Sequence, residues 1–327
     1  MALVSIIVPC YNEETTIQFL LDALYRQTFP RTQLEIVIAD GISTDFTLQR
    51  IQEFQNNHPD LLIRVIKNDR RTIPSGVNAA IRNAQGDIII RLDAHSMPHC
   101  DYVTKCVENL TQKYGDNVGG VWEIQPGRSG WLANSIALAA SNPLGVGDAR
   151  YRFTKQAGPV DTVPFGAFRR TLIDKVGLFD ESLLTNEDYE FNTRVRRAGG
   201  TVWLDPAIRT VYFARSDLAA LGRQYWRYGY WKLRMLRRYP NTIRWRQALP
   251  PIFVAGLIVL GLLAIFLPIF RWLFLSILGM YLLVLILDGL FLAIKHHDAS
   301  LIIGIPLSIV VMHFSWGAAF LWSLLGR

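Results

Sequence analysis

The stretch DIIIRLDAHS, residues 87–96, decides the fold. Its apolar run from Asp87 to Leu92 predicts a short buried strand. Asp93 and His95 then emerge at the C-terminal end of that strand, where open α/β sheets place their ligands. A carboxylate and an imidazole two residues apart can share one divalent cation that also holds a diphosphate, which suggests nucleotide-sugar chemistry. The alternative is an aspartate that only caps the following turn.

A second acidic cluster, TNEDYEF, follows at residues 185–191. Asn186, Glu187 and Asp188 lie at a predicted helix start. A carboxylate within hydrogen-bond reach of a sugar hydroxyl can act as its general base. The alternative is that acidic residues are simply favourable in a first helical turn, because they interact with the helix dipole.

Strand and helix signals alternate through the first part of the chain, which predicts a mainly parallel sheet with helices on both faces. The expected strands cover residues 3–8, 34–39, 62–66, 87–92 and 118–123. The expected helices lie near residues 14–27, 44–57, 75–84 and 101–114. Polar groups follow three of the strands, and because parallel strands end at one edge of a sheet, we expect these groups to lie close together.

The apolar residues, 50% of the 327, are concentrated at the C-terminal end. Three intervals there are long enough to cross a bilayer as helices, and we expect spans near 249–268, 272–294 and 300–324. Buried core helices are the alternative, and three such runs in succession make it improbable. Prolines at 250, 251 and 268 allow the first span to be kinked or interfacial.

A basic segment rich in aromatic residues, 215–246, precedes the spans. It holds nine Lys or Arg residues against one acid, Asp217, and so carries a charge of +8. Basic residues beside a first span mark the cytosolic side and attract anionic head groups. Nucleic-acid binding is the competing interpretation, and the adjacent membrane spans argue against it. We therefore expect three parts: 1–214 catalytic, 215–246 interfacial and 247–327 membrane-embedded.

The N-terminal residues Met1 to Pro9 look like a strand, without a basic leader or a cleavage site, so we expect the catalytic part to stay in the cytosol. The three cysteines, Cys10, Cys100 and Cys106, follow no metal-ligand spacing and suit a reducing compartment.

Taken together, the motifs resemble the inverting family 2 glycosyltransferases of the GT-A fold, and within them the subgroup of the succinoglycan-biosynthesis protein ExoA. The resemblance covers nearly all of residues 3–240. The motifs that carry it are VSIIVPCYNEE (4–14), IADGISTD (38–45), RLDAH (91–95), TNEDYEFNTRVRRAGG (185–200) and RQYWRY (223–228). It implies a nucleoside diphosphate sugar donor and a single-displacement mechanism.

The resemblance also implies roles for residues of the donor site. Pro9, Tyr11 and Glu13 would line the uracil and ribose pocket, and Asp40 would bond to the base. Asp93 and His95 stand at the family's DXD motif. Imidazole in place of the second carboxylate makes Mn²⁺ at least as suitable as Mg²⁺.

Further residues would act on the diphosphate and the acceptor. Arg70 and Arg71 would reach diphosphate oxygens, with solvated turn charges as the alternative. The resemblance assigns Asp188 as the base and Glu187 as its orienting neighbour. A partial match to the QxxRW motif of membrane synthases, with tyrosine replacing tryptophan, adds three residues at the leaving group: Gln224, Arg227 and Tyr228.

We therefore expect a multi-pass inner-membrane glycosyltransferase that moves a sugar from a UDP-sugar to a lipid-linked saccharide in polysaccharide biosynthesis. The expected sugar is glucose. The expected partners are the donor, the lipid-linked acceptor and anionic lipids, but no nucleic acid. A membrane glycerolipid or polyprenyl phosphate is the alternative acceptor. An inactive nucleotide-sugar-binding scaffold is the alternative of another class, and a polymer-extruding synthase is disfavoured because three spans offer little to build a channel.

Overall fold

The structure is a computed structural model that describes residues 3–326. Its strands are β1 (Val4–Cys10), β2 (Leu34–Asp40), β3 (Leu62–Lys67), β4 (Ile88–Arg91), β5 (Met97–Pro98), β6 (Asn117–Gln125), β7 (Gly158–Pro159), β8 (Ala167–Arg169) and β9 (Val202–Phe213). Its helices are α1 (Ile17–Tyr25), α2 (Thr47–Asn57), α3 (Ile73–Asn83), α4 (Tyr102–Thr111), α5 (Trp131–Ser141), α6 (Pro143–Val146), α7 (Thr171–Val176), α8 (Glu187–Arg197), α9 (Leu218–Arg238), α10 (Trp245–Phe266), α11 (Pro268–His296) and α12 (Leu301–Leu325). Short 3-10 turns cover Arg31–Gln33, Arg150–Arg152 and Pro240–Thr242.

The described strands form one mixed sheet with the order β3-β2-β1-β4-β8-β6-β9-β5, and β7 pairs with β9. Strand β1 lies parallel to β2 and β4, and β2 lies parallel to β3. Strand β8 is antiparallel to both β4 and β6, and β5 is antiparallel to β9. The predicted α/β class is confirmed, and the antiparallel half, built from β5 to β9, is more extensive than the sequence indicated.

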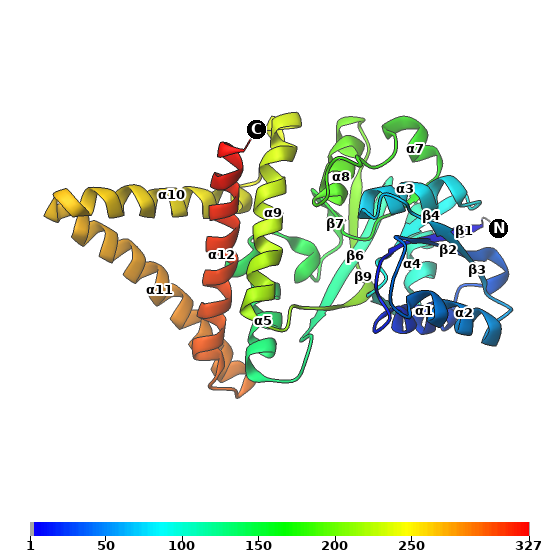
Figure 1. Cartoon of the computed structure of the whole chain (residues 1–327), viewed down its shortest axis with the longest axis horizontal. Coiled ribbons are helices and arrows are strands. Elements are labelled where there is room, and N and C mark those ends of the chain that lie inside the picture. Colours follow the sequence, from blue (N-terminus) through cyan, green and yellow to red (C-terminus); the bar gives the residue numbers. More distant parts are fainter. Residues whose placement is uncertain (1–2, 327) are drawn as a thin grey trace. The chain divides into compact units, whose positions relative to one another are not determined.

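The parallel strands β1 and β2 are buried along their whole length, because helices cover both faces of this part of the sheet. On one face, alternate residues of β1, β2 and β4 pack against α1, α2 and α4. Helix α3 packs against β1 and β2. Figure 1 shows α3 on one side of these strands and α1 and α2 on the other.

The chain divides into two compact units. The sheet unit comprises Met1–Glu123 and Phe153–Tyr212, and the helical unit comprises Ile124–Arg152 and Phe213–Arg327. The helical unit therefore contains α5 and α6, which come from the middle of the chain, together with the C-terminal helices.

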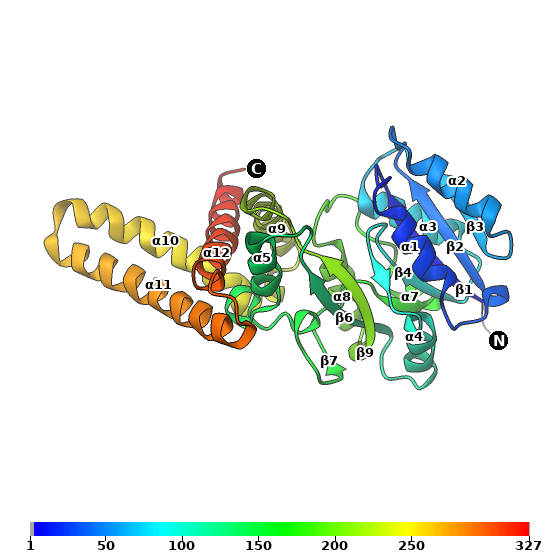
Figure 2. The same cartoon turned by 90° about the horizontal axis from the view of Figure 1, so that it is seen from below.

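Three helices of the helical unit, α10, α11 and α12, are long and apolar enough to cross a membrane. Helices α10 and α11 form a hairpin, and α9 lies beside α12 in both views of the molecule (Figures 1 and 2). The hairpin directs large apolar side chains into the surroundings, as at Ile258, Phe266 and Trp272. This surface is typical of helices that contact lipid.

Candidate active site

The ends of β1 and β2 bring several predicted donor-site residues together. Cys10 and Asp40 are direct partners across the two parallel strands, so Tyr11 and Asp40 lie at neighbouring positions of the sheet edge. Asn12 links the loop after β1 to the loop after β2 by two hydrogen bonds. Its backbone N–H donates to Ser43 Oγ (2.9 Å), and its side chain accepts from the Thr44 N–H (2.9 Å).

Asp40 is buried, and its carboxylate accepts hydrogen bonds from the Ser43 N–H (3.0 Å) and hydroxyl (2.6 Å). Gly41 lies against Tyr11, since a Cβ atom at position 41 would come within 3.2 Å of that side chain. Pro9 packs in the same way against Gly76. Asp40 thus shapes the loop beside Tyr11, while its bond to a base stays a prediction.

Glu13 and His95 meet across the strand ends. The Nδ1 atom of His95 lies 3.2 Å from Glu13 Oε1, and the backbone N–H of Glu13 donates to Thr47 Oγ1 at 2.7 Å. The loop after β1 and the loop after β4 are thereby joined at the same edge. This places Glu13 next to the predicted cation site as well as in the predicted ribose pocket.

Arg91, the last residue of β4, is the centre of the acidic site. Its side chain is only 2% exposed and contacts three carboxylates. Its guanidinium donates to Asp93 at 3.1 Å, to Glu187 at 2.9 Å and to Asp188. The structure therefore brings together the two acidic clusters that the sequence singled out.

Sequence reasoning missed Arg91, although one signal was available. An arginine inside the apolar run IIIRL has to be buried, and a buried charge is stable only when it is paired and hydrogen-bonded. Such a residue therefore points to acidic partners elsewhere in the chain.

The electrostatics of the cluster favour a basic carboxylate. Burial raises the pKa of Asp188 above its ordinary value, and the neighbouring Glu187 and Asp93 raise it further, while Arg91 opposes them. Asp188 is the second residue of α8, and Asn186, which caps that helix just before Glu187, has the left-handed conformation (φ 68°). A carboxylate with a raised pKa is a stronger proton acceptor once it is ionised.

The donor set fits a divalent cation. Asp93 would supply a carboxylate oxygen and His95 an imidazole nitrogen, a mixture that suits Mn²⁺ as well as Mg²⁺. Within residues 3–326 no group of three His, Cys, Asp or Glu side chains is arranged so that it could hold a metal ion by itself. A cation here would therefore take further oxygens from a bound diphosphate and from water, as Mg²⁺ commonly does. The three carboxylates around the single positive charge of Arg91 leave a negative excess that would also attract the cation.

The two arginines after β3 lie at the surface. Arg70 is 74% exposed on its side chain and pairs with Glu181, with Nη1 and Oε2 2.6 Å apart. Asn78 also donates to Glu181, at 2.9 Å. Arg71 is exposed and has a positive φ of 54°. Exposed ion pairs of this kind contribute little to stability, so Arg70 can exchange Glu181 for another anion at small cost.

The remaining predicted residues, Gln224, Arg227 and Tyr228, lie on α9 in the helical unit. Gln224 Nε2 donates to Tyr228 Oη at 2.9 Å, as expected for residues four apart on one helix face. Arg227 is exposed. Their role at a leaving group stays a prediction.

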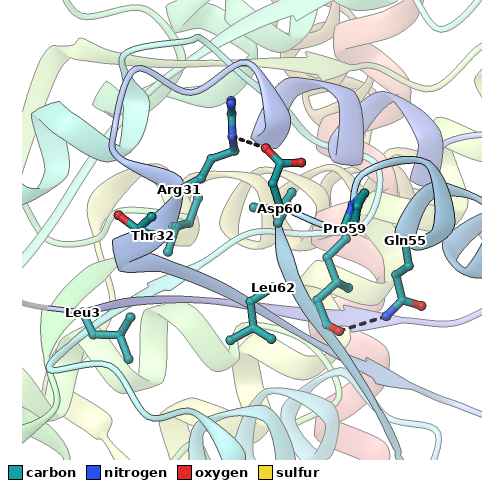
Figure 3. A pocket seen from close by; sticks show the side chains of 10 residues that line it. Leu3, Arg31, Thr32, Gln55, Pro59, Asp60 and Leu62 are labelled. Carbon is teal, nitrogen blue, oxygen red and sulfur yellow. Dashed lines mark hydrogen bonds and ion pairs between the residues drawn. The ribbon is translucent and has the colours of Figure 1, made fainter.

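A surface hollow of about 360 Å³ lies elsewhere on the sheet unit (Figure 3). Arg31 and Asp60 form an ion pair of 2.8 Å at its rim, and Leu34 and Leu62, which begin β2 and β3, line it. Its lining includes none of the residues predicted for the active site. Because ligands of open α/β sheets bind where parallel strands end, this hollow is not the candidate active site.

Comparison with known proteins agrees with this geometry. Residues 5–177 match the family described as glycosyl transferase family 2. The chain belongs to this family. It is 29% identical over 317 residues to a dolichyl N-acetyl-α-D-glucosaminyl phosphate 3-β-D-2,3-diacetamido-2,3-dideoxy-β-D-glucuronosyltransferase of Methanococcus voltae, covering 96% of this chain and 94% of that protein. The succinoglycan biosynthesis protein ExoA of Rhizobium meliloti is 29% identical over 325 residues, covering 98% and 94%.

A solved structure shows the same fold over nearly the whole chain. The mannosyltransferase PcManGT of Pyrobaculum calidifontis, in complex with GDP-mannose and Mn²⁺, superposes with a TM-score of 0.63 at 21% identity. The match covers 95% of this chain and 87% of the mannosyltransferase. The predicted GT-A architecture of this family 2 glycosyltransferase is confirmed.

Proposed function

We propose that this family 2 glycosyltransferase transfers a sugar from a UDP-sugar to a lipid-linked saccharide at the cytosolic face of the inner membrane, with inversion of the configuration at C1. Glucose is the proposed sugar. The observation that carries the proposal is the convergence of Asp93, Glu187 and Asp188 on the buried guanidinium of Arg91. In this proposal, the cluster joins Asp93, which would bind the donor, to Asp188, which would act as the base.

In the proposed mechanism, Asp188 accepts the proton of the acceptor hydroxyl as its oxygen attacks C1 of the donor sugar. The new C–O bond forms while the bond from C1 to the diphosphate oxygen breaks, so an α-linked donor gives a β-linked product. Arg91 and Glu187 orient Asp188. A carboxylate base within hydrogen-bond reach contributes roughly two to four orders of magnitude to the rate.

The departing UDP carries negative charge that the site has to hold. Asp93 and His95 would bind Mn²⁺ or Mg²⁺, which neutralises charge on the diphosphate when present. Arg70, Arg71, Gln224, Arg227 and Tyr228 are the proposed further contacts of the donor. Pro9, Tyr11, Glu13 and Asp40 would hold its nucleoside.

The acceptor proposal is supported by the relatives and by the apolar helices. One relative is named for transfer to a dolichyl-linked sugar phosphate, and the other for succinoglycan biosynthesis. Three helices suited to a membrane would keep the enzyme where a lipid-linked acceptor presents its head group.

The test uses membranes that contain the full chain, supplied with a panel of radiolabelled UDP-sugars and with GDP-mannose. We expect label from one UDP-sugar in extractable lipid, and much slower incorporation of that label with the Asp188→Asn variant. Mild acid should release the label from a polyprenyl-diphosphate-linked product, whereas mild alkali would release it from an acylated glycerolipid. Incorporation from GDP-mannose alone would overturn the donor assignment, and UDP binding without any transfer would indicate a scaffold.

A further inference from the structure

Helix α12 differs from the two other candidate membrane spans. It is the least apolar of the three, and the largest share of its apolar segment is buried inside the protein. It also contains polar residues, among them His313, whose Nδ1 lies 3.1 Å from Tyr281 Oη on α11. These features are typical of a helix that packs against protein rather than lipid.

The helix beside α12 cannot enter the hydrocarbon core. Helix α9 is 21 residues long and carries six basic residues and no acidic one: Arg223, Arg227, Lys232, Arg234, Arg237 and Arg238. At 1.5 Å per residue these charges are distributed over most of a length of about 30 Å, close to the thickness of a bilayer core. Charged side chains at the bilayer centre are strongly disfavoured.

Helices α9 and α12 run parallel and in contact along this length. A Cβ atom on Gly222 would come within 3.3 Å of Ser315 Oγ, and one on Gly229 would lie 2.3 Å from the carbonyl oxygen of Trp316. At the far end, Arg237 donates to the backbone carbonyls of Ser323 (3.1 Å) and Gly326 (3.2 Å). If α12 crossed the bilayer, α9 and its charges would have to cross with it.

The contacts of α12 with the α10–α11 hairpin lead to the same conclusion. Trp316 Nε1 donates to the carbonyl of Gln247, in the first turn of α10, at 3.1 Å. Near the other end of α12, the carbonyl of Leu301 approaches Gly289 in the last part of α11. Helix α12 thus contacts the half of the hairpin away from the turn, from Gly289 to Tyr281 on α11 and at Gln247 on α10, whereas a third span packed along the hairpin would extend to the turn at Leu267.

We propose that only the α10–α11 hairpin crosses the bilayer, and that α9 and α12 lie together in the headgroup region of an anionic membrane. The exposed arginines of α9 other than Arg227, namely Arg223, Arg237 and Arg238, match anionic head groups. Exposed apolar residues of α12, such as Ile303 and Trp322, fit the shallow apolar layer beneath them. This inference does not depend on the proposed donor or acceptor, and it revises the expectation of three crossings.

The proposal fixes the side on which α12 ends. With two crossings, Leu325 lies on the same side of the membrane as the sheet unit, and only the hairpin turn reaches the other side. With three crossings, Leu325 lies on the opposite side. Leu325 is 79% exposed and Ile269, beside the turn, is 69% exposed, so both positions suit a chemical label.

The experiment measures labelling by a membrane-impermeant maleimide in intact and in permeabilised cells. Cys100 is exposed and reports the side of the sheet unit, while Cys10 and Cys106 are buried. Leu325→Cys and Ile269→Cys are each made in a chain that carries Cys100→Ser. We expect the Leu325→Cys variant to follow Cys100 and the Ile269→Cys variant to show the opposite pattern.

Labelling of the Leu325→Cys variant together with the Ile269→Cys variant would overturn the proposal. A second version places the cysteine in a short Gly-Ser extension after Arg327, which is accessible in permeabilised cells whatever the depth of α12. If this extension is labelled only when Cys100 is labelled, the proposal holds; if it follows Ile269→Cys, the proposal fails. The readout involves no sugar transfer, so failure of the proposed function would leave it unchanged.

Discussion

At the scale of single residues, Arg91 sets the charge of the acidic site. One guanidinium faces three carboxylates, which leaves a negative excess that suits a divalent cation. The acidic residues were identifiable in the sequence, because each follows a strand end or begins a helix. The apolar run around Arg91 indicated a buried charge but not its partners, since Glu187 and Asp188 lie 96 and 97 residues further along the chain and no local pattern links them to Arg91.

We expect Asp188→Asn to lower turnover by about two to four orders of magnitude, because the amide keeps the shape but cannot accept a proton. UDP affinity should change little, since the base contacts the acceptor. Transfer assays combined with UDP titration measure both quantities. Asp174→Asn, an exposed change on α7, is the matched control. A loss of UDP binding in proportion to activity would show that Asp188 belongs to the donor site.

The raised pKa of Asp188 predicts how activity depends on pH. The base works only when ionised, so kcat/KM should fall as the pH decreases through this raised pKa. Glu187→Gln removes a negative neighbour that raises this pKa, so the acidic limb of the profile should move to lower pH. A pH profile of kcat/KM for both proteins tests this. A limb that stays in place or moves upward would contradict the assignment.

Metal dependence should follow from the proposed cation site at Asp93 and His95. We expect excess EDTA to abolish transfer and added Mn²⁺ to restore it. His95→Asp should keep part of the activity and shift the preference toward Mg²⁺, because it replaces nitrogen by oxygen. Activities measured across a series of divalent ions compare the two proteins. Full activity of the natural sequence in EDTA would remove the cation from the mechanism.

At the scale of elements, hydrophobic periodicity located the long elements well and the short ones poorly. Strands β1 to β4 and helices α1 to α4 occur where the apolar patterns placed them. Strands β5, β7 and β8 have only two or three residues, too few to show a period. They form because β4 and β9 offer edges for pairing, which is a property of the assembled sheet.

The close contact of α9 and α12 should depend on Gly229. In Gly229→Ala the new Cβ would meet the backbone carbonyl of Trp316 at 2.3 Å, and a backbone atom cannot easily move aside. We expect a loss of about 1–3 kcal/mol in stability. The matched control is Gly256→Ala on α10, where the Cβ meets nothing within 4 Å and helix propensity improves. Thermal unfolding in detergent compares them, and equal midpoints would contradict the packing.

At the scale of the whole molecule, the sequence predicted consecutive domains, whereas the helical unit draws on two separate parts of the chain. Helix α5, from the middle of the chain, packs against α12, and a Cβ atom on Gly304 would overlap Ser135. Composition alone could not reveal this, because α5 is too short to register as a span and its partner is distant in sequence.

Removal of the α10–α11 hairpin should change how the protein is attached to the membrane. If a flexible linker replaces residues 252–292, only α9 and α12 remain at the lipid surface, and the attachment should become sensitive to salt, which screens charge within about 10 Å at 0.1 M. Sedimentation after washes with high salt and alkaline carbonate measures this. A chain that lacks residues 299–327 is the control and should remain in the pellet. Persistence of the hairpin-less chain in the carbonate pellet would mean that α12 crosses the bilayer.

The packing of α5 against α12 also has a consequence for biosynthesis. A ribosome makes the α5 segment long before the final helix, so its buried face, which includes Ile136 and Ala139, has no partner while most of the chain is being made. Exposed apolar surface in such intermediates favours aggregation. Nascent chains of this enzyme should therefore need a chaperone, or early contact with the membrane, until translation of α12 is complete.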